Sequence, residues 1–421
     1  MDKLLIQGPV QLRGKVKVSS AKNATLPILV ATLVCPYPVK FESVPELMDV
    51  STIIKLLQSM GVKLEKNGDE TILDATTLEN QHADYSLVKT MRASVLVLGP
   101  LLARFGQASV SLPGGCAIGA RPVDIHLSGL EKMGAEIQIE NGYIKAKATK
   151  LKGCTIPLSF PSVGATENLM MAAVLAEGTT IIENAAMEPE IDDLADFLIA
   201  QGVRIEGAGT SRITIHGQDI SHMKKNPKPY RIIGDRIEAA TFIIAGIMCE
   251  SEIRVEGFNP THLGNVIETL KKMGAQLELG NDFVDVKKSK RLKGAVIDTA
   301  PYPGFPTDVQ AQMMALLSVV DGNSVITETI FENRFMHVPE MGRMGAKVTI
   351  KGNSAMIEGV ESLSAAPVMC TDLRASAALV MCALKASGET EIQRVYHLDR
   401  GYEKIDEKLT QLGANIKRVK G

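Results

Sequence analysis

The sequence contains no tryptophan, and only 4% of its 421 residues are aromatic, so its hydrophobic cores have to be built from aliphatic side chains. None of its apolar runs reaches the ~20 residues that a transmembrane helix needs, and no signal-type apolar segment follows the first residues. Neither sign of charge is in excess, because 46 Lys and Arg face 48 Asp and Glu. This balance argues against a general nucleic-acid or anionic-membrane binder. We therefore expect a cytoplasmic globular protein with no nucleic-acid and no membrane partner.

Paired cysteines and metal-binding motifs are also missing. The six cysteines are scattered without any CxxC pair, and the seven histidines form no HExxH motif. Such usage fits reduced thiols better than a disulfide framework or a zinc site. We expect no metal and no cofactor, and apart from Cys116 we expect the cysteines to be inert residues in apolar surroundings. The sequence does not indicate an oligomeric state.

What the sequence does contain is a repeat of about seventy residues. A helix-like segment that ends in glycine and leads into a strand-like segment occurs six times, as in LLQSMGVKLE and LEKMGAEIQI. Glycine is the usual residue just past a helix, because it takes positive φ without a steric clash. The glycines concerned are spaced 68 to 73 residues apart, and they are Gly61, Gly134, Gly202, Gly274, Gly345 and Gly413.

Between these segments runs a second kind of helix, which lacks a polar face. Examples are GDRIEAATFIIAGIM and DLRASAALVMCALK, whereas the glycine-terminated helices carry charged residues on one side. The first pattern predicts helices buried on most sides, and the second predicts helices exposed to solvent. Each repeat therefore reads approximately as βαβαββ. We expect two similar lobes, each with three buried helices inside and its sheets outside, although one long solenoid is an alternative.

The repeat places ionisable residues at one register near the start of the buried helices. That register holds Lys22, Arg92, Gly164, Arg236, Asp308 and Arg374. Helix N-termini favour anions, so cations placed there indicate an anionic ligand. Arg121, Arg334 and Arg400 fall in comparable loops before the exposed helices. These side chains would suit a small substrate that carries phosphate and carboxylate groups. The alternative is that each cation simply pairs with a surface carboxylate.

Two further residues could carry chemistry. Cys116 lies among the glycines of SLPGGCAIGARP, five residues before Arg121, and an electropositive glycine-rich loop favours a reactive thiol. The loop does not have the spacing of a P-loop or of GxGxxG. Asp308 is the one acid at the helix-start register. It could serve only as a helix N-terminal carboxylate, or it could accept a proton from a substrate hydroxyl.

Taken together, SSAKNATLPIL, LVKTMRAS, SLPGGCAIGARPVDIH, PSVGAT, FPTDVQAQ, FENRFMHVPEMGRMGA, TDLRAS and YHLDRGYEKI resemble the UDP-N-acetylglucosamine enolpyruvyl transferases over the whole chain. This resemblance implies a fold of two inside-out α/β barrel domains, each built from three βαβαββ repeats, with the active site in the cleft between them. It also implies that residues 22–230 form one lobe and that residues 1–21 with 231–421 form the other. The implied reaction transfers the enolpyruvyl group of phosphoenolpyruvate to the 3′-hydroxyl of UDP-N-acetylglucosamine and releases phosphate.

The same resemblance assigns roles to individual residues. It implies that Cys116 is the general acid, and also the thiol that bonds covalently to phosphoenolpyruvate or to fosfomycin, and that Asp308 is the base. The residues implied to bind phosphoenolpyruvate are Lys22, Asn23, Arg121, Arg334, Arg374 and Arg400, with Lys22 and Arg400 also counted as catalytic. The residues implied to bind the sugar nucleotide are Asn23, Arg92, Arg121, Pro122, Val123, Asp124, Ile125, Ser162, Val163, Gly164, Asp308 and Ile330.

One position departs from the family pattern. Some members carry a lysine two residues before the SVGAT motif, near the diphosphate, where this chain has Phe160. A phenyl ring cannot neutralise a diphosphate, so that contact would have to come from backbone N–H groups near Ser162 to Gly164 or from elsewhere. Two other functions stay open: a shikimate 3-phosphate enolpyruvyl transferase, and a non-catalytic paralogue that binds the sugar nucleotide and regulates. Cys116 in the PGGC loop and the ARPVD segment argue against the first, and the presence of both Cys116 and Asp308 argues against the second.

Overall fold

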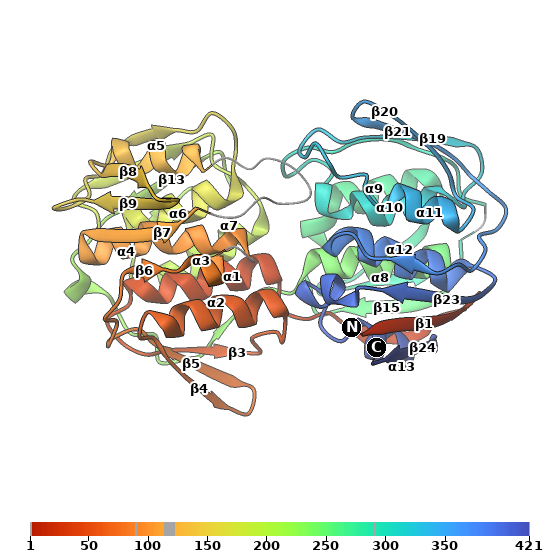
Figure 1. The fold of residues 1–421 in the computed structure, drawn as a ribbon, viewed down its shortest axis with the longest axis horizontal. Coiled ribbons are helices and arrows are strands. Elements are labelled where there is room, and N and C mark those ends of the chain that lie inside the picture. The colour runs from red at the N-terminus through yellow and green to blue at the C-terminus, as the bar shows by residue number, and fades with distance from the viewer. Residues whose placement is uncertain (1, 89–90, 113–122, 290, 421) are drawn as a thin grey trace. The chain divides into compact units, whose positions relative to one another are not determined.

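The computed structural model describes residues 2–88, 91–112, 123–289 and 291–420, which form two compact units (Figure 1). We call residues 20–112 with 123–233 the Lys22 unit, and residues 2–19 with 234–420 the Asp308 unit. Each unit has its own hydrophobic core, and the two cores share no residue. Each unit can therefore be described as a domain in its own right.

The described residues of each unit form three four-stranded sheets that share one strand order. In every sheet the first two strands are parallel and the other neighbours are antiparallel. The Lys22 unit contains the sheets β14 (Tyr230–Arg231), β3 (Val39–Glu42), β5 (Glu70–Asp74), β4 (Lys63–Asn67); β6 (His82–Ala83), β7 (Gln107–Ser111), β9 (Tyr143–Lys147), β8 (Glu136–Glu140); and β10 (Thr155–Pro157), β11 (Thr179–Glu183), β13 (Arg212–His216), β12 (Arg204–Glu206).

The sheets of the Asp308 unit include strands from both ends of the chain. They are β2 (Arg13–Lys17), β15 (Glu252–Glu256), β17 (Phe283–Lys287), β16 (Gln276–Leu279); β18 (Val296–Asp298), β19 (Asn323–Thr327), β21 (Ser354–Glu358), β20 (Lys347–Lys351); and β22 (Val368–Met369), β23 (Gly388–Gln393), β1 (Lys3–Gly8), β24 (Asn415–Val419). Strand β1 takes the place that the last strand of a repeat occupies elsewhere, so the final repeat is completed from the beginning of the chain.

The helices fall into an inner and an outer set. The inner helices are α1 (Lys22–Ala31), α4 (Leu98–Phe105) and α6 (Val163–Ala173) in the Lys22 unit, and α8 (Arg236–Met248), α10 (Gln310–Leu317) and α12 (Leu373–Lys385) in the Asp308 unit. The outer helices are α2 (Met48–Ser59), α5 (Asp124–Lys132), α7 (Pro189–Ala200), α9 (Gly264–Met273), α11 (Val338–Arg343) and α13 (Ile405–Gln411). A short helix, α3 (Tyr85–Val88), lies before the second inner helix.

Short 3₁₀ helices flank several of these elements. They are η1 (Thr32–Val34), η2 (Arg92–Val97), η3 (Ile220–His222), η4 (Pro260–Leu263), η5 (Thr307–Val309) and η6 (Val395–Arg400). Both α4 and α10 are entered through such a turn, η2 and η5 respectively. A 3₁₀ turn at a helix start tightens the backbone there, so the residue it carries is held by local hydrogen bonds.

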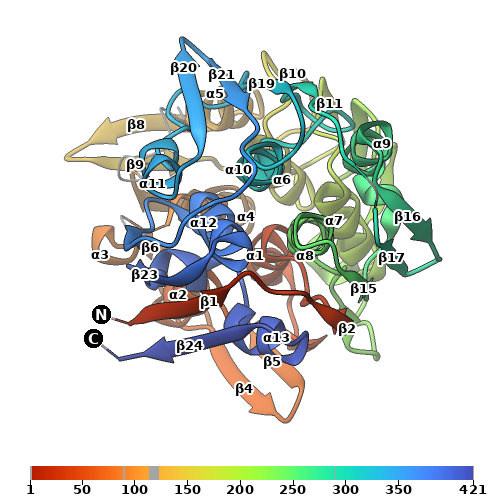
Figure 2. The same ribbon diagram turned by 90° about the vertical axis from the view of Figure 1, so that its right-hand side faces the viewer.

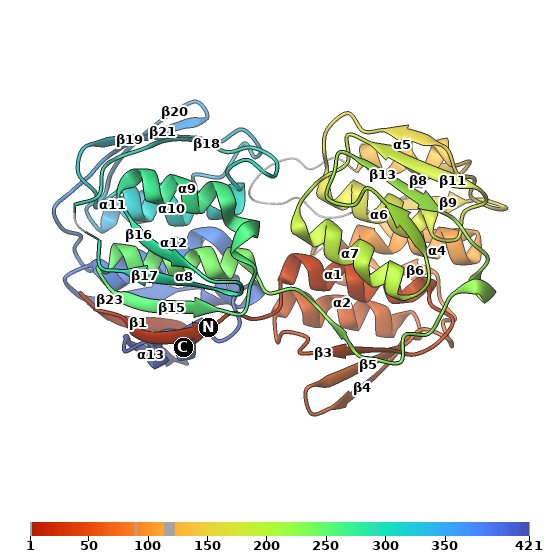
Figure 3. The ribbon, with the colours of Figure 1, turned by 180° about the vertical axis from the view of Figure 1, so that it is seen from behind.

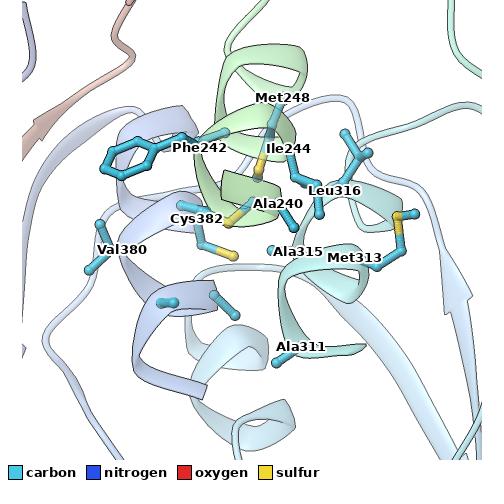
Figure 4. Packing of buried hydrophobic residues seen from close by; sticks show 14 of the residues in the cluster. Ala240, Phe242, Ile244, Met248, Ala311, Met313, Ala315, Leu316, Val380 and Cys382 are labelled. Carbon is cyan, nitrogen blue, oxygen red and sulfur yellow. The ribbon is translucent and has the colours of Figure 1, made fainter. Parts of the chain in front are cut away.

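The inner helices pack against one another and the sheets lie around them, as the apolar pattern predicts. All thirteen residues of α8 are buried, and Figure 4 shows Phe242, Ile244 and Met248 of α8 facing α10 and α12. Figure 2 looks at the Asp308 unit with these helices inside its strands, and Figure 3 shows β11 and β13 outside α6 in the Lys22 unit. A buried aliphatic side chain stabilises the fold by about 1.5–3 kcal/mol, so such helices are stable only when covered all round.

The register predicted from the repeat is confirmed. All six glycines have positive φ, between 88° and 108°. Each of the six ionisable-register positions lies within the first two residues of an inner helix or of its 3₁₀ entry turn. One prediction was wrong in part: Cys35, Cys249, Cys370 and Cys382 are buried, but Cys154 is partly exposed and its thiol donates to the Lys132 carbonyl. Among the described residues, no helix is both long and apolar enough to cross a membrane.

Candidate active site

Lys22 begins the inner helix α1 and is paired with a buried carboxylate. Its Nζ atom lies 3.4 Å from Oδ2 of Asp49, and the two side chains are only 12% and 8% exposed. A cation at a helix N-terminus is unfavourable by itself, and Asp49, in the first turn of α2, offsets that charge. Asn23 follows Lys22 and is half-buried. The sequence did not point to Asp49, because the contact depends on how α1 and α2 pack.

The first turn of α6 brings a second group of predicted residues together. Ser162 caps this helix, and its hydroxyl accepts a hydrogen bond from the N–H of Ala165 at 3.3 Å. Val163 and Gly164 follow as the first helical residues. Their backbone N–H groups belong to the set that has no partner within the helix, and such groups bind anions. Phe160 precedes them and is 44% exposed, with its carbonyl accepting from the Ser162 N–H.

His126 of α5 packs beside this turn. The amide of Asn168 is oriented by the Gly99 N–H, which donates to its Oδ1 at 2.7 Å, so its Nδ2 donates to His126 Nδ1 at 3.0 Å. The proton of a neutral His126 therefore belongs on Nε2. A Cβ atom on Gly164 would lie 3.5 Å from that nitrogen. The predicted run Val123, Asp124 and Ile125 begins the same helix, so the packing of α5 on α6 brings both predicted segments to one place.

In the Asp308 unit, one carboxylate binds two arginines. Oδ1 of Asp308 accepts from Nη2 of Arg334 at 2.8 Å, and Oδ2 accepts from Nη2 of Arg374 at 3.0 Å. Both arginine side chains are 3% exposed, whereas Asp308 is 26% exposed. Burial alone would lower the pKa of Arg374, but the nearby Asp308 charge outweighs it and the pKa is raised. The two cations are thus held in place by the residue predicted to be the base.

A buried network of polar side chains is hydrogen-bonded to the backbone of Asp308. The hydroxyl groups of Tyr402 and Thr241 lie 2.9 Å apart, and Gln312 Nε2 donates to both and to the Asp308 carbonyl. The guanidinium of Arg374 lies 5.6 Å from the centre of the Tyr402 ring. Its Nη1 is buried and has no hydrogen-bond partner among the described residues. A buried donor without a partner is costly, and an acceptor oxygen within reach would remove that cost.

Two histidines lie close to the arginines of this unit. Burial lowers the pKa of His337 to about 4, so its ring is neutral at pH 7 next to Arg334. Burial and the charge of Arg400 lower the pKa of His397. Arg400 ends η6, which packs on α12, the helix whose second residue is Arg374. The structure thus brings Arg334 and Arg374 onto the carboxylate of Asp308, and Arg400 lies in the same unit.

Ile330 is held by a carboxylate that sequence reasoning missed. Its N–H donates to Oε1 of Glu328 at 2.8 Å, and Glu328 is only 3% exposed. Glutamate in a run such as TETIFEN carries no sequence signal, because its role depends on which N–H groups and hydroxyls surround it.

The structure does not test every predicted site residue. Cys116, Arg121 and Pro122 lie outside the described residues, and of Arg92 only the backbone is described, as the start of η2. Over the described ranges, no group of three or more His, Cys, Asp or Glu side chains is arranged to hold a metal ion. Chemically, the described residues offer a helix N-terminus suited to an anion, a paired lysine, and a carboxylate clamped by arginines.

Comparisons with known proteins agree with this chemistry. The family model described as EPSP synthase (3-phosphoshikimate 1-carboxyvinyltransferase) matches residues 6–409. The chain is 54% identical over its full length, and over the full length of the relative, to the UDP-N-acetylglucosamine 1-carboxyvinyltransferase of Enterobacter cloacae. It is 52% identical to the protein of the same name from Geotalea uraniireducens, again with 100% of both chains covered.

Solved structures show the same fold. The enolpyruvyl transferase NikO from Streptomyces tendae superposes with a TM-score of 0.88 at 25% identity, covering 100% of this chain and 99% of that one. EPSP synthase from Acinetobacter baumannii superposes with a TM-score of 0.77 at 19% identity, covering 100% of both chains, and so supports the fold alone.

Proposed function

The chain belongs to the enolpyruvyl transferase family, among the UDP-N-acetylglucosamine 1-carboxyvinyltransferases, and we propose that it transfers the enolpyruvyl group of phosphoenolpyruvate to the 3′-hydroxyl of UDP-N-acetylglucosamine. A proton adds to the methylene carbon of phosphoenolpyruvate, and the sugar oxygen bonds to the neighbouring carbon as its own proton leaves. The tetrahedral intermediate then loses a proton from the former methylene carbon while its bond to the phosphate oxygen breaks. The products are the enolpyruvyl ether and inorganic phosphate.

The proposed acid is Cys116 and the proposed base is Asp308. Protonation of carbon needs a well-placed acid and an environment that stabilises the positive charge growing at the next carbon. The contacts of Asp308 indicate that it acts as a base only when substrate is bound. A carboxylate held by Arg334 and Arg374 is a weak proton acceptor, because both guanidinium groups stabilise its negative charge. An anionic substrate that competes for those N–H groups would free a carboxylate oxygen for the sugar hydroxyl.

Five cations are proposed to bind phosphoenolpyruvate: Lys22, Arg121, Arg334, Arg374 and Arg400. The buried Nη1 of Arg374 supports this, because a phosphate or carboxylate oxygen would supply the partner that it lacks. Asn23, beside Lys22, is proposed to contact both substrates. Lys22 and Arg400 are also proposed to act in the chemical step.

The sugar nucleotide is proposed to bind the start of α6. Ser162, Val163 and Gly164 offer N–H groups to the diphosphate, and α6 is long enough to contribute a helix dipole. The half-exposed Phe160 adds apolar surface there and no charge, so the helix N-terminus would have to provide the contact. The remaining proposed contacts are Arg92, Arg121, Pro122, Val123, Asp124, Ile125, Asp308 and Ile330.

The observation that carries the proposal is the full-length 54% identity to a UDP-N-acetylglucosamine 1-carboxyvinyltransferase, in a chain whose Asp308 is bound to two buried arginines. The test is phosphate release from phosphoenolpyruvate with either UDP-N-acetylglucosamine or shikimate 3-phosphate as acceptor. Release with the first acceptor alone supports the proposal. Release with shikimate 3-phosphate would assign the chain to the sister reaction, and release with neither would indicate a binding protein.

A pair of lysine variants makes this test specific to the site. Lys22→Met removes the buried cation that Asp49 holds, and we expect phosphate release to fall by at least about a hundred-fold, as for loss of a group that contacts the transition state. Lys40→Met is the matched control, because Lys40 pairs with Glu70 at the surface of the same unit. Equal activity of the two variants would argue against the role of Lys22.

The cellular role follows from the proposed reaction. The product would be the first committed intermediate of peptidoglycan precursor synthesis, which links the protein to cell shape and cell division. We propose that it acts in the cytoplasm, where the thiols of its five described cysteines would stay reduced. Fosfomycin would inactivate it by alkylating Cys116.

A further inference from the structure

Glu328 is a buried carboxylate whose hydrogen bonds join two separate turns of the Asp308 unit. Its Oε1 accepts from the Thr299 hydroxyl at 2.9 Å and from the N–H groups of Ile330 and Phe331 at 2.8 and 3.1 Å. Its Oε2 accepts from the Thr307 hydroxyl at 2.8 Å. Three donors hold Oε1 and one holds Oε2, so the orientation of the carboxylate is fixed from both of its oxygens.

Both turns carry residues of the proposed site. Ile330 belongs to the turn after β19, and Thr307 immediately precedes Asp308 in η5. The other flank of Asp308 is fixed as well, because its carbonyl accepts from Gln312 Nε2 at 3.0 Å. The backbone that carries the Asp308 carboxylate is therefore held by two hydrogen bonds. One joins Thr307, the preceding residue, to Glu328, and the other joins the Asp308 carbonyl to Gln312.

We propose that Glu328 is a positioning residue of the transferase reaction: through Thr307 it sets where the Asp308 carboxylate meets the sugar hydroxyl. This inference rests on the proposed function. It explains why this carboxylate is buried at 3% exposure with hydroxyl and N–H donors, and with no cation bonded to it within the described part of the chain. A purely structural tie between two turns needs only a neutral acceptor, whereas a carboxylate makes stronger hydrogen bonds and holds the turn more rigidly.

Replacing Glu328 by glutamine changes one of its hydrogen bonds and keeps the others. In Glu328→Gln the single carbonyl oxygen has to face the N–H groups of Ile330 and Phe331, because an NH₂ group there would oppose two donors. The NH₂ group then faces Thr307 and donates to its hydroxyl oxygen, so the hydrogen bond runs in the opposite direction and loses the strength that a carboxylate acceptor gives it. Glu328→Gln thus alters the bond to Thr307 and spares the turn at Ile330. Thr307→Val removes the same bond from the other side, and Thr307→Ser keeps the hydroxyl as the matched control.

The experiment measures kcat and KM for both substrates with wild type, Glu328→Gln, Thr307→Val, Thr307→Ser and the double variant Glu328→Gln with Thr307→Val. We expect kcat of Glu328→Gln and of Thr307→Val to fall between about ten-fold and a hundred-fold, as for a small misplacement of a reacting group. The KM for phosphoenolpyruvate should change by less than about three-fold. Thr307→Ser should keep near wild-type kcat, and the double variant should be no slower than the slower single variant.

Each contrary result has a distinct meaning. Wild-type kcat in Glu328→Gln and Thr307→Val would overturn the inference, and so would a Thr307→Ser variant as slow as Thr307→Val. A double variant whose losses multiply would show two independent effects and would also overturn it. Calorimetric unfolding of each variant gives the folded fraction used to normalise kcat, so a mere loss of folded protein cannot imitate the result. Failure of the proposed function is seen separately, as absence of phosphate release by wild type.

Discussion

Removing the Asp308 carboxylate should destabilise the Asp308 unit as well as impair turnover. Asp308→Ala leaves Arg334 and Arg374 with two like charges at 3% exposure and without the oxygens that bind their Nη2 atoms. Breaking a buried ion pair by deleting one partner is costly, because the remaining charge stays buried without compensation. Here one deletion leaves two such charges close together.

The magnitude can be worked from the contacts. A hydrogen bond to a charged group contributes about 1.5–3 kcal/mol, and two are lost. Water screens part of this because Asp308 is 26% exposed, so we expect a loss of about 3 kcal/mol in the free energy of unfolding. For a unit of roughly 200 residues, 1 kcal/mol shifts Tm by about 2–4 °C. The transition of the Asp308 unit should therefore fall by roughly 6–12 °C.

The assay is differential scanning calorimetry at low salt, which resolves separate transitions where two units do not unfold as one. Asp298→Ala, an exposed aspartate at the end of β18, serves as the matched control. Inorganic phosphate is then added, because a dianion can take the place of the carboxylate between the two guanidinium groups. It should raise the Tm of Asp308→Ala by more than that of wild type.

Two results would refute this reasoning. One is an Asp308→Ala protein that unfolds within about 2 °C of wild type in the absence of phosphate. The other is an equal response of both proteins to phosphate, which would mean that the guanidinium groups do not bind the added anion where Asp308 was.

Three further predictions concern other parts of the chain. Gly164→Ala should fold with unchanged Tm, because its Cβ would meet His126 only at ordinary contact distance. It should nevertheless weaken the binding of UDP-N-acetylglucosamine, measured by calorimetric titration. Unchanged affinity would argue against a diphosphate site at α6. Burial and the charges of Asp196 and Glu190 raise the pKa of Asp192 to about 6. Because the folded protein then holds this proton more tightly than the unfolded chain does, the free energy of unfolding falls as pH rises from about 4 towards 6. Asp192→Asn should therefore raise Tm at pH 8 and have no effect near pH 4, and a pH-independent difference would contradict this origin. Cys116→Asp should keep turnover, because a carboxylic acid can donate a proton, and should resist labelling by fosfomycin, because it is not a thiol nucleophile. Mass spectrometry measures the labelling. Rapid labelling of the loop in this variant would disprove the role of the thiol.

The repeat made much of the fold predictable. Gly61 and its five counterparts marked the helix ends, and the apolar runs marked the inner helices, because both signals come from local backbone sterics and from burial. What the spacing could not give was the strand that completes the last repeat. Strand β1 pairs with β23 and β24, and that pairing depends on contacts across almost the whole chain.

The candidate site was predictable to the same extent. Lys22, Asp308 and Arg374 stood out because the repeat put them at one register. The sequence did not show that Asp308 would bind both Arg334 and Arg374, since side chains choose their partners only after helices pack. Asp49 and Glu328 went unnoticed for the same reason: a buried carboxylate is defined by the donors around it, and Lys22, Thr299 and Thr307 come from elements distant in sequence.

The pairing of β1 also has a consequence for synthesis on the ribosome. Gly8 lies opposite Gly388, so the first strand emerges 380 residues before its partner. At about 5–20 residues per second, it waits roughly 20–80 seconds with both edges unsatisfied. The Lys22 unit can complete its sheets from residues 20–233 during that delay. Nascent chains should therefore acquire protease resistance in the interior of the sequence first, with the earliest-made segment among the last to be protected.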